Sequence, residues 1–152
     1  MNIQKLGISL LFPLIIGISS AILTRDAMQT FEQISKPPLS PPGILFPILW
    51  TILYVLMGLS FYLVWSSGGL TKRALFLYSA QLFFNFFWSI WFFEQGWYLF
   101  SFVWLLILWI LILGTILSFY KINRVASWLL LPYLLWVTFA GYLNLSIYLL
   151  NP

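Results

Sequence analysis

The feature that most constrains the fold of this chain is the recurrence of five apolar runs. The runs cover residues 6–24, 44–65, 74–93, 97–119 and 126–149, and none of them contains a charged residue. A helix of about 20 apolar residues, at a rise of about 1.5 Å per residue, crosses a hydrocarbon core of about 30 Å. The runs do not alternate apolar with polar residues, as the strands of a membrane β-barrel do. The sequence therefore predicts an all-α integral membrane protein, with five transmembrane helices in a single domain over residues 1–152.

The composition supports a membrane protein and excludes several kinds of site. Hydrophobic residues make up 62% of the chain and charged residues only 7%, which is too few to give a soluble domain a polar surface. The chain has no cysteine and no histidine, so disulfides, thiolate chemistry and the commonest metal ligands are excluded. We therefore expect no metal site and no bound cofactor. The bases are spread over the connectors without forming the basic face of a nucleic-acid-binding protein, so no nucleic-acid partner is expected.

The first run has a second interpretation, as a secretory signal peptide. Lys5 precedes the run, and Ser19-Ser20-Ala21 resembles a cleavage site. The run continues to Thr24, however, which is long enough to span a bilayer, and a first transmembrane helix is the preferred interpretation.

The distribution of bases predicts the orientation in the membrane. In a five-helix topology, five bases fall on the side of the N-terminus, and only two fall on the opposite side. Because bases are enriched in cytoplasmic connectors, the N-terminus is predicted to be cytoplasmic and the C-terminus external. The five are Lys5, Lys72, Arg73, Lys121 and Arg124, and the two are Arg25 and Lys36.

The longest connector, residues 25–43, has more structure than a simple tether needs. Asp26, with Gln29 three residues later, is typical of a helix start, and residues 27–34 are long enough for two turns. Prolines then stiffen the chain into an extended path. Long connectors of this kind are often lids over a site, although a rigid spacer between two helices explains the same pattern. The predicted lid residues are Lys36, Pro37, Pro38, Pro41 and Pro42.

Two of the runs are predicted to serve mainly in packing. Small and polar residues recur at intervals of three and four along the first run, which favours close contact with a neighbouring helix. The fourth run is almost entirely Leu, Ile, Trp and Phe, and we expect it to face lipid or another protomer. The stripe in the first run is Ser9, Pro13, Gly17, Ser20 and Thr24.

The other three runs carry aromatic and polar residues on one helical face. At the rise of an α-helix, Trp50, Asn85 and Asn144 lie about 8 to 12 Å below the external end, with Ala140 at about 14 Å and Trp136 at about 20 Å. This depth predicts a pocket beneath the proline-rich connector. Interhelical hydrogen bonding by the amides and space filling by the aromatics explain the pattern equally well. The residues are Trp50 and Tyr54 in the second run, Gln81, Asn85, Trp88, Ser89 and Phe92 in the third, and Tyr133, Trp136, Ala140, Asn144 and Tyr148 in the fifth.

These stretches together resemble the signatures of the translocator protein family, also called tryptophan-rich sensory proteins (TspO/MBR). They occur in the order seen in that family and cover nearly the whole chain. The matching stretches are Lys36-Pro37-Pro38 with Pro41-Pro42, Trp50 to Tyr54 with Met57-Gly58, Gln81-Leu82 with Asn85, Trp88, Phe92 and Phe93, and Pro132-Tyr133-Leu134 with Trp136, Phe139-Ala140 and Leu143-Asn144.

The resemblance implies a homodimer of five-helix bundles, each with a pocket closed by the first loop. It implies binding of porphyrins such as protoporphyrin IX and of synthetic benzodiazepine-like and isoquinoline ligands, in a role in porphyrin transport, sensing or regulation. Without a histidine, a cysteine or a buried carboxylate to ligate iron, a free-base porphyrin is the better expectation. Carried over by position, the pocket residues are Trp50, Tyr54, Asn85, Trp88, Trp136, Ala140 and Asn144.

The family also suggests an alternative function and a point of difference. Some bacterial members are reported to degrade porphyrin in light, which would make Trp50 and Trp136 candidate catalytic residues. Leu39 stands where many relatives have tryptophan, so the lid is expected to contact a ligand less strongly. No base follows Tyr148, as the cholesterol motif of animal members requires, so cholesterol is not expected as a partner. The compact length and this missing tail favour a bacterial plasma membrane.

Overall fold

The structure, a computed structural model, describes residues 1–151 apart from the side chain of Met28, so Pro152 of the predicted domain lies outside the described residues. This part of the chain is helical and contains no strand. Five helical segments are long and apolar enough to cross a membrane, which confirms the all-α, five-helix prediction. The elements are α1 (Ile3–Thr24), α2 (Ala27–Gln33), α3 (Leu45–Ser66), α4 (Lys72–Ser89), the π-helical turn η1 (Ile90–Glu94), α5 (Tyr98–Tyr120), α6 (Arg124–Leu129) and α7 (Leu131–Leu150).

Side-chain caps set the starts of three helices. The side chain of Asn2 accepts a hydrogen bond from the backbone N–H of Lys5 at the start of α1. Thr71 and Asn123 cap α4 and α6 in the same way. Such a cap satisfies a backbone donor that has no partner inside the helix, so it fixes where the helix begins.

The fifth apolar run is divided, which the sequence analysis did not predict. It forms the short helix α6 and the long helix α7, which meet at Leu130. Pro132 lies in the first turn of α7, where its missing N–H leaves no intrahelical bond unmade. Inside one continuous helix a proline leaves a carbonyl without its partner, as Pro13 does in α1, whereas the start of a new helix at Leu131 places Pro132 where it has no such bond to make.

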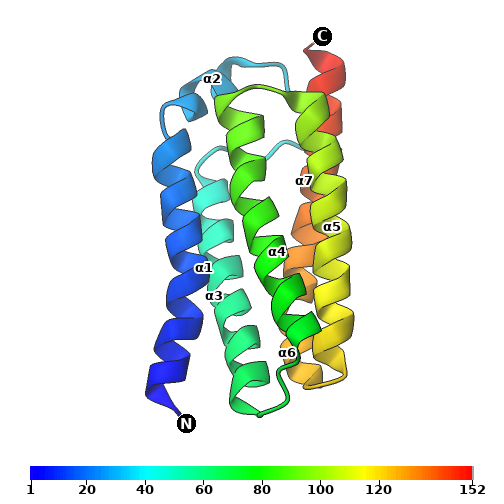
Figure 1. Cartoon of the computed structure of the whole chain (residues 1–152). Helices are drawn as coiled ribbons and strands as arrows, with labels where there is room; N and C mark the ends of the chain where they lie inside the picture. The colour runs from blue at the N-terminus through cyan, green and yellow to red at the C-terminus, as the bar shows by residue number, and fades with distance from the viewer. Residues whose placement is uncertain (152) are drawn as a thin grey trace.

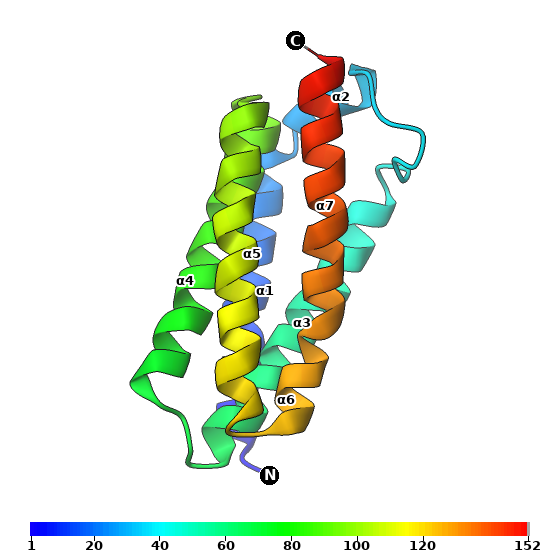
Figure 2. The same ribbon diagram turned by 90° about the vertical axis from the view of Figure 1, so that its right-hand side faces the viewer.

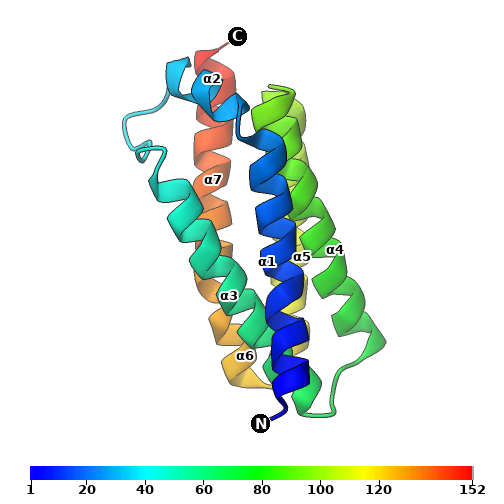
Figure 3. The ribbon, with the colours of Figure 1, turned by 90° about the vertical axis from the view of Figure 1, so that its left-hand side faces the viewer.

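The helices pack side by side with the two termini at opposite ends of the bundle (Figure 1). Helix α1 packs on α3, α4 packs on α5, and α5 packs on α7, while α6 contacts both α3 and α5. The short helix α2 lies across the end of the bundle that holds the C-terminus (Figures 1 and 2). From the opposite side, α1 and α3 are seen to meet near the N-terminal end and to diverge toward α2 (Figure 3).

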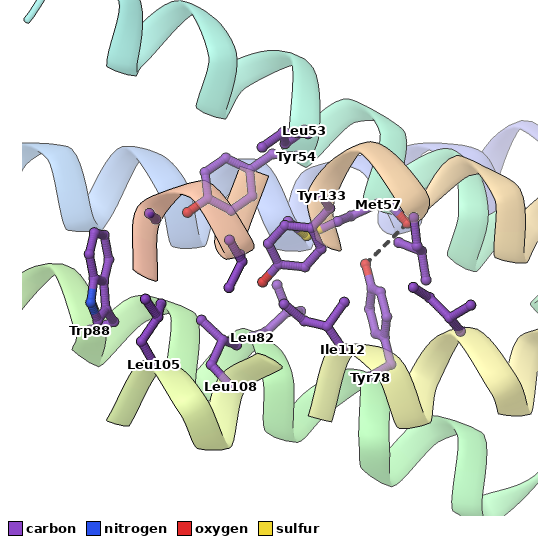
Figure 4. Packing of buried hydrophobic residues seen from close by; sticks show 14 of the residues in the cluster. Leu53, Tyr54, Met57, Tyr78, Leu82, Trp88, Leu105, Leu108, Ile112 and Tyr133 are labelled. Carbon is purple, nitrogen blue, oxygen red and sulfur yellow. Dashed lines mark hydrogen bonds between the residues drawn. The ribbon is translucent and has the colours of Figure 1, made fainter. Parts of the chain in front are cut away.

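The fourth run was expected to face lipid or another protomer, and in the structure α5 has one face buried in the bundle and one face exposed. Leu105, Leu108 and Ile112 are at most 2% exposed and pack in the centre of the bundle (Figure 4). They recur at intervals of three and four, as one face of a helix requires. The opposite face is exposed, as Ile110 shows at 65%. A run of uniformly apolar residues has no polar stripe to mark which face is inside, so the sequence did not distinguish the two faces.

The backbones of α1 and α3 approach closely at Gly58. A Cβ atom at this position would lie 2.7 Å from the carbonyl oxygen of Ser9 and 2.9 Å from the Cα atom of Leu10. Pro13 has no N–H to donate to the Ser9 carbonyl, the bond that an ordinary residue would make four positions later in the helix. Gly58 therefore lets the two helices touch beside a carbonyl left without its helical partner.

Candidate ligand-binding cavity

A cavity of about 470 Å³ lies between α1, α3 and α4 at the end of the bundle that α2 covers. A volume of this order is typical of sites for small organic ligands, which span about 300 to 1,000 Å³. Its lining is mostly apolar and aromatic, with a few hydroxyls, one carboxamide and two charged residues. The lining residues are Gly17, Ser20, Ala21, Thr24, Arg25, Glu32, Gly43, Ile44, Phe46, Pro47, Trp50, Tyr54, Asn85, Trp88, Ser89 and Phe93.

Helix α1 contributes a wall of small residues, which the sequence analysis did not assign to the site. Of the stripe predicted to pack against a neighbouring helix, Ser9 and Pro13 are buried and lie outside the lining, whereas Gly17, Ser20 and Thr24 line the cavity. A Cβ atom at Gly17 would lie 2.3 Å from the ring of Tyr54, so only glycine leaves room for that ring. Small residues at helical spacing can border either a helix or a void, and the sequence does not say which.

Helix α3 contributes the aromatic wall. Trp50 and Tyr54, one turn apart, stack with ring centroids 5.5 Å apart and an angle of 28° between their planes. Trp50 also meets Tyr133 and Trp136 of α7 edge to face, with centroids 6.2 and 6.5 Å away. Trp50 therefore separates the cavity from the aromatic residues of α7.

Helix α4 and the turn η1 form the third wall. Asn85, Trp88 and Ser89 line the cavity, and the hydroxyl of Ser89 is hydrogen-bonded to that of Ser20 on α1. The wider π-helical turn that follows changes the direction of the next side chains. Phe93 faces the cavity, whereas Phe92, predicted to share a face with Asn85, borders a separate small space of about 10 Å³ next to α7.

A chain of buried hydrogen bonds joins α3, α4 and α7. The hydroxyl of Tyr54 donates to Oδ1 of Asn85 at 2.8 Å, and Nδ2 of Asn85 donates to the hydroxyl of Tyr133 at 2.8 Å. The hydroxyl of Tyr133 donates in turn to Oε1 of Gln81 at 2.7 Å. The rings of Tyr54 and Tyr133 enter the interior from different helices, as Figure 4 shows. Asn85 therefore both lines the cavity and links helices, so its carboxamide is at once a residue of the pocket and an interhelical hydrogen-bonding group.

Four of the predicted ligand-binding residues lie outside this lining. Gln81 is buried and bonded to Tyr133, and Asn144 accepts a hydrogen bond from Nε1 of Trp88 at 3.0 Å and donates to the backbone oxygen of Tyr98. Both carboxamides thus act in helix packing. The other two are Trp136, which packs on Phe46 and Trp50, and Ala140, which borders the small space next to α7.

The physical reason for this difference is the position of α7. Its residues were expected to enclose the cavity with α3 and α4, but rings of Trp50, Phe46 and Trp88 stand between α7 and the cavity, and α1 supplies the remaining wall. Helical spacing gives the inward face of α7 correctly. It does not give the neighbour that this face meets.

The predicted lid residues are also absent from the lining. The Nζ atom of Lys36 donates to the carbonyl oxygen of Phe31 at 2.8 Å and lies 4.7 Å from the centre of the Phe31 ring. The side chain of Lys36 therefore caps the end of α2. The connector instead borders the cavity through Glu32 of α2 and through Gly43 and Ile44 before α3. The remaining predicted lid residues, Pro37, Pro38, Pro41 and Pro42, lie between these two points.

The mouth of the cavity lies where α1 and α3 diverge. Five lining residues are exposed, and they belong to the end of α1, to α2 and to the start of α3. Two of them carry opposite charges, so the mouth is polar while the interior is mainly apolar. This arrangement suits a ligand with a flat apolar body and a charged end. The exposed lining residues are Ala21, Arg25, Glu32, Ile44 and Pro47.

The chain is similar in sequence to a known protein family over most of its length. The TspO/MBR family model matches residues 9–150. The "Tryptophan-rich protein TspO" of Archaeoglobus fulgidus is 41% identical over 153 residues, which cover 99% of each chain. The "Translocator protein" of Bos taurus is 34% identical over 93% of this chain and 86% of its own. The "Tryptophan-rich sensory protein" of Cereibacter sphaeroides is 33% identical over 88% of this chain and 82% of its own.

Proposed function

The chain belongs to the TspO/MBR family and is a multi-pass membrane protein, and on that basis we propose that its cavity binds a tetrapyrrole such as protoporphyrin IX. The observation that carries the proposal is the cavity between α1, α3 and α4, with aromatic walls and a polar mouth. The role that we propose is porphyrin transport, sensing or regulation; the names "Translocator protein" and "Tryptophan-rich sensory protein" of two relatives speak of translocation and of sensing.

The interior of the cavity suits a flat macrocycle. Indole and phenol rings offer their faces to a π-system, and stacking of this kind contributes about 0.5 to 1.5 kcal/mol beyond the burial of area. Trp50 is half-buried with its ring at the cavity, whereas Trp88 is held in place by its hydrogen bond to Asn144. Trp50 is therefore the residue that a bound porphyrin would stack on.

The charged mouth fits the propionates of a porphyrin. Of the two bases at this end of the bundle, Arg25 lines the cavity, whereas the amino group of Lys36 is already bonded to the end of α2. Guanidinium groups bind carboxylates with paired hydrogen bonds. Glu32, which also lines the mouth, repels carboxylates, so a porphyrin would enter with its propionates toward Arg25.

The first prediction is that protoporphyrin IX quenches tryptophan fluorescence of the purified protein saturably, and that Ala21→Phe weakens this binding about tenfold, or about 1.4 kcal/mol. Ala21 lines the cavity, so a phenyl ring there occupies space that the ligand needs. Ile22→Phe is the matched control, because Ile22 is the next residue of α1 and is 56% exposed outside the cavity.

The outcomes of this titration are distinct. Absence of saturable quenching by the wild type rejects porphyrin binding. Binding that Ala21→Phe, Trp50→Leu and Ile22→Phe all leave unchanged places the ligand elsewhere on the protein.

The alternative function is light-dependent oxidation of porphyrin by tryptophans of the pocket. One observation favours it: the rings of Trp50 and Trp136 meet edge to face beside the cavity, so an indole radical formed at Trp50 has an oxidisable neighbour. The described cavity lining otherwise offers hydroxyls without a buried base. The same titration repeated under illumination in air distinguishes the functions. A porphyrin spectrum that stays unchanged rejects the enzyme, and loss of the porphyrin that Trp50→Phe stops supports it.

We also propose that the end carrying the N-terminus is cytoplasmic, in a bacterial plasma membrane. Five bases lie at this end, and the three acids Asp26, Glu32 and Glu94 all lie at the other end with two bases. The positive-inside rule counts bases, and the excess of five over two favours a cytoplasmic N-terminal end.

The second prediction tests this orientation with single cysteines. Because the chain has none of its own, Ser67→Cys and Gln95→Cys introduce one thiol each, in exposed connectors at opposite ends of the bundle. In intact cells, a membrane-impermeant maleimide is expected to label the thiol at position 95, and to label the thiol at position 67 only after permeabilisation. The opposite pattern would reverse the topology.

A further inference from the structure

Among the described side chains of α2, the aromatic ring of Phe31 is the one that is buried in the bundle. Phe31 is 5% exposed, although most of the helix around it is exposed. Its ring meets Phe46 edge to face with centroids 5.7 Å apart, and Phe93 with centroids 5.3 Å apart. Phe46 and Phe93 line the cavity themselves. The position of α2 therefore decides how two walls of the cavity are packed.

A pair of hydrogen bonds holds the chain directly after α2. The backbone N–H of Ser35 donates to Oδ1 of Asn151 at 3.2 Å, and Nδ2 of Asn151 donates to the backbone oxygen of Ser35 at 2.8 Å. Nδ2 also donates to the backbone oxygen of Ile147 at 2.9 Å, which fixes the carboxamide on the last turn of α7. The side chain of Asn151 thus pairs with both backbone groups of Ser35, which lies 116 positions away in the sequence. The hydroxyl of Ser35 takes no part in the pair.

This pair is the specific polar link between the connector and the rest of the bundle. Within the described part of the chain, the other hydrogen bonds of residues 34–44 are local, such as those from Lys36 to Phe31 and from Ser40 to Pro37. A helix of seven residues is not stable by itself, because forming its first turn costs more than its few hydrogen bonds return. Without the pair, α2 depends on the packing of Phe31.

We propose that Asn151 is a positioning residue that holds α2, with Phe31, against the mouth of the cavity and thereby limits how fast a ligand enters and leaves. The control of ligand entry and exit rests on the proposed function, whereas the anchoring of α2 by Asn151 does not. Loss of the pair frees α2 to swing away, which withdraws Glu32 from the mouth and unpacks Phe46 and Phe93.

The test compares two substitutions at Ser35, one that removes the backbone N–H and one that keeps it. Ser35→Pro removes the N–H that bonds to Asn151, whereas Ser35→Ala removes only a hydroxyl that takes no part in the pair. Ile34 has ψ of 159°, the extended conformation that a residue before proline prefers. Asn151→Ala removes both hydrogen bonds of the pair, whereas Ser35→Pro removes only the bond from the Ser35 N–H.

The third prediction is that amide hydrogens of α2 exchange at least tenfold faster in Ser35→Pro and in Asn151→Ala, with Ser35→Ala within twofold of the wild type. Hydrogen exchange followed by mass spectrometry on the peptide covering α2 measures this without any ligand. Dissociation of protoporphyrin IX, measured by stopped flow after mixing with excess apo-myoglobin, is expected to accelerate in the same two variants.

Three outcomes separate the parts. Wild-type exchange of α2 in both Ser35→Pro and Asn151→Ala overturns the proposal, whatever the porphyrin does. Faster exchange with unchanged porphyrin dissociation overturns its gating part, because the ligand then leaves by a route that α2 does not cover. Faster exchange in a protein whose wild type binds no porphyrin supports the positioning role of Asn151 and rejects the proposed function instead.

Discussion

Replacing Gly58 with leucine is expected to force α1 away from α3 and to destabilise the bundle by about 3 kcal/mol, the upper end of the usual cost of overpacking. The first added carbon alone would lie 2.7 Å from the Ser9 carbonyl oxygen and 2.9 Å from the Cα atom of Leu10. Both are backbone atoms, so no side chain can rotate to make room. Leucine favours helices more than glycine does, so a loss of stability reports the clash and not helix propensity.

The measurement is the midpoint of thermal unfolding in detergent, followed by circular dichroism. Gly7→Leu is the matched control on the partner helix, because no atom lies within 4 Å of a Cβ atom at Gly7. A control inside a span is Gly114→Leu, where the nearest atoms belong to the flexible side chain of Leu77. We expect the two controls to unfold near the wild type. If Gly58→Leu does so as well, α1 and α3 do not touch at this point.

The overall architecture followed from the sequence because the bilayer imposes a simple length requirement on each helix. No charged residue lies within any of the five apolar runs, and a helix in lipid satisfies its own backbone, so length and composition were enough. The break at Leu130 was harder to predict, because Pro132 is tolerated both in the first turn of a helix and within membrane helices.

The candidate cavity was only partly predictable, and for a different reason. Spacing along one helix places Trp50 with Tyr54, and Asn85 with Trp88 and Ser89, and all five line the cavity. Which helices face each other depends on tilt and rotation, which single-helix periodicity does not contain. This is why residues of α7 were expected in the wall that α1 supplies.

Tyr133 illustrates what sequence reasoning missed. It was placed on the inner face of its helix, but its role as the link between Asn85 and Gln81 was not foreseen. A tyrosine carries a donor and an acceptor at the end of a long rigid side chain, so it reaches carboxamides on a facing helix. Two carboxamides one turn apart on α4, facing a buried tyrosine, are the signal from which this chain of hydrogen bonds could have been predicted.

The hydrogen-bonded chain leads to the second large effect, which is expected from Asn85→Leu. The substitution removes the acceptor of Tyr54 and the donor to Tyr133 together, and it leaves the hydroxyl of Tyr54 buried without a partner. A polar bond between membrane helices contributes about 0.6 to 2 kcal/mol, and a buried unpaired group costs about 1 to 3 kcal/mol. We therefore expect a loss of about 2 to 3 kcal/mol of stability, measured by the same unfolding assay.

A double-mutant cycle separates this coupling from general disruption of the core. Tyr54→Phe alone leaves Oδ1 of Asn85 unpaired, at an expected cost of about 1 kcal/mol. Once Asn85 is leucine, Tyr54→Phe removes a hydroxyl that has lost its partner, so the double variant should be no less stable than Asn85→Leu alone. Tyr78→Phe is the control pair, because the Tyr78 hydroxyl bonds to the backbone oxygen of Met57 and shares no partner with Asn85. Its effect should add to that of Asn85→Leu, and if Tyr54→Phe proves equally additive, the two side chains are not bonded in the folded protein.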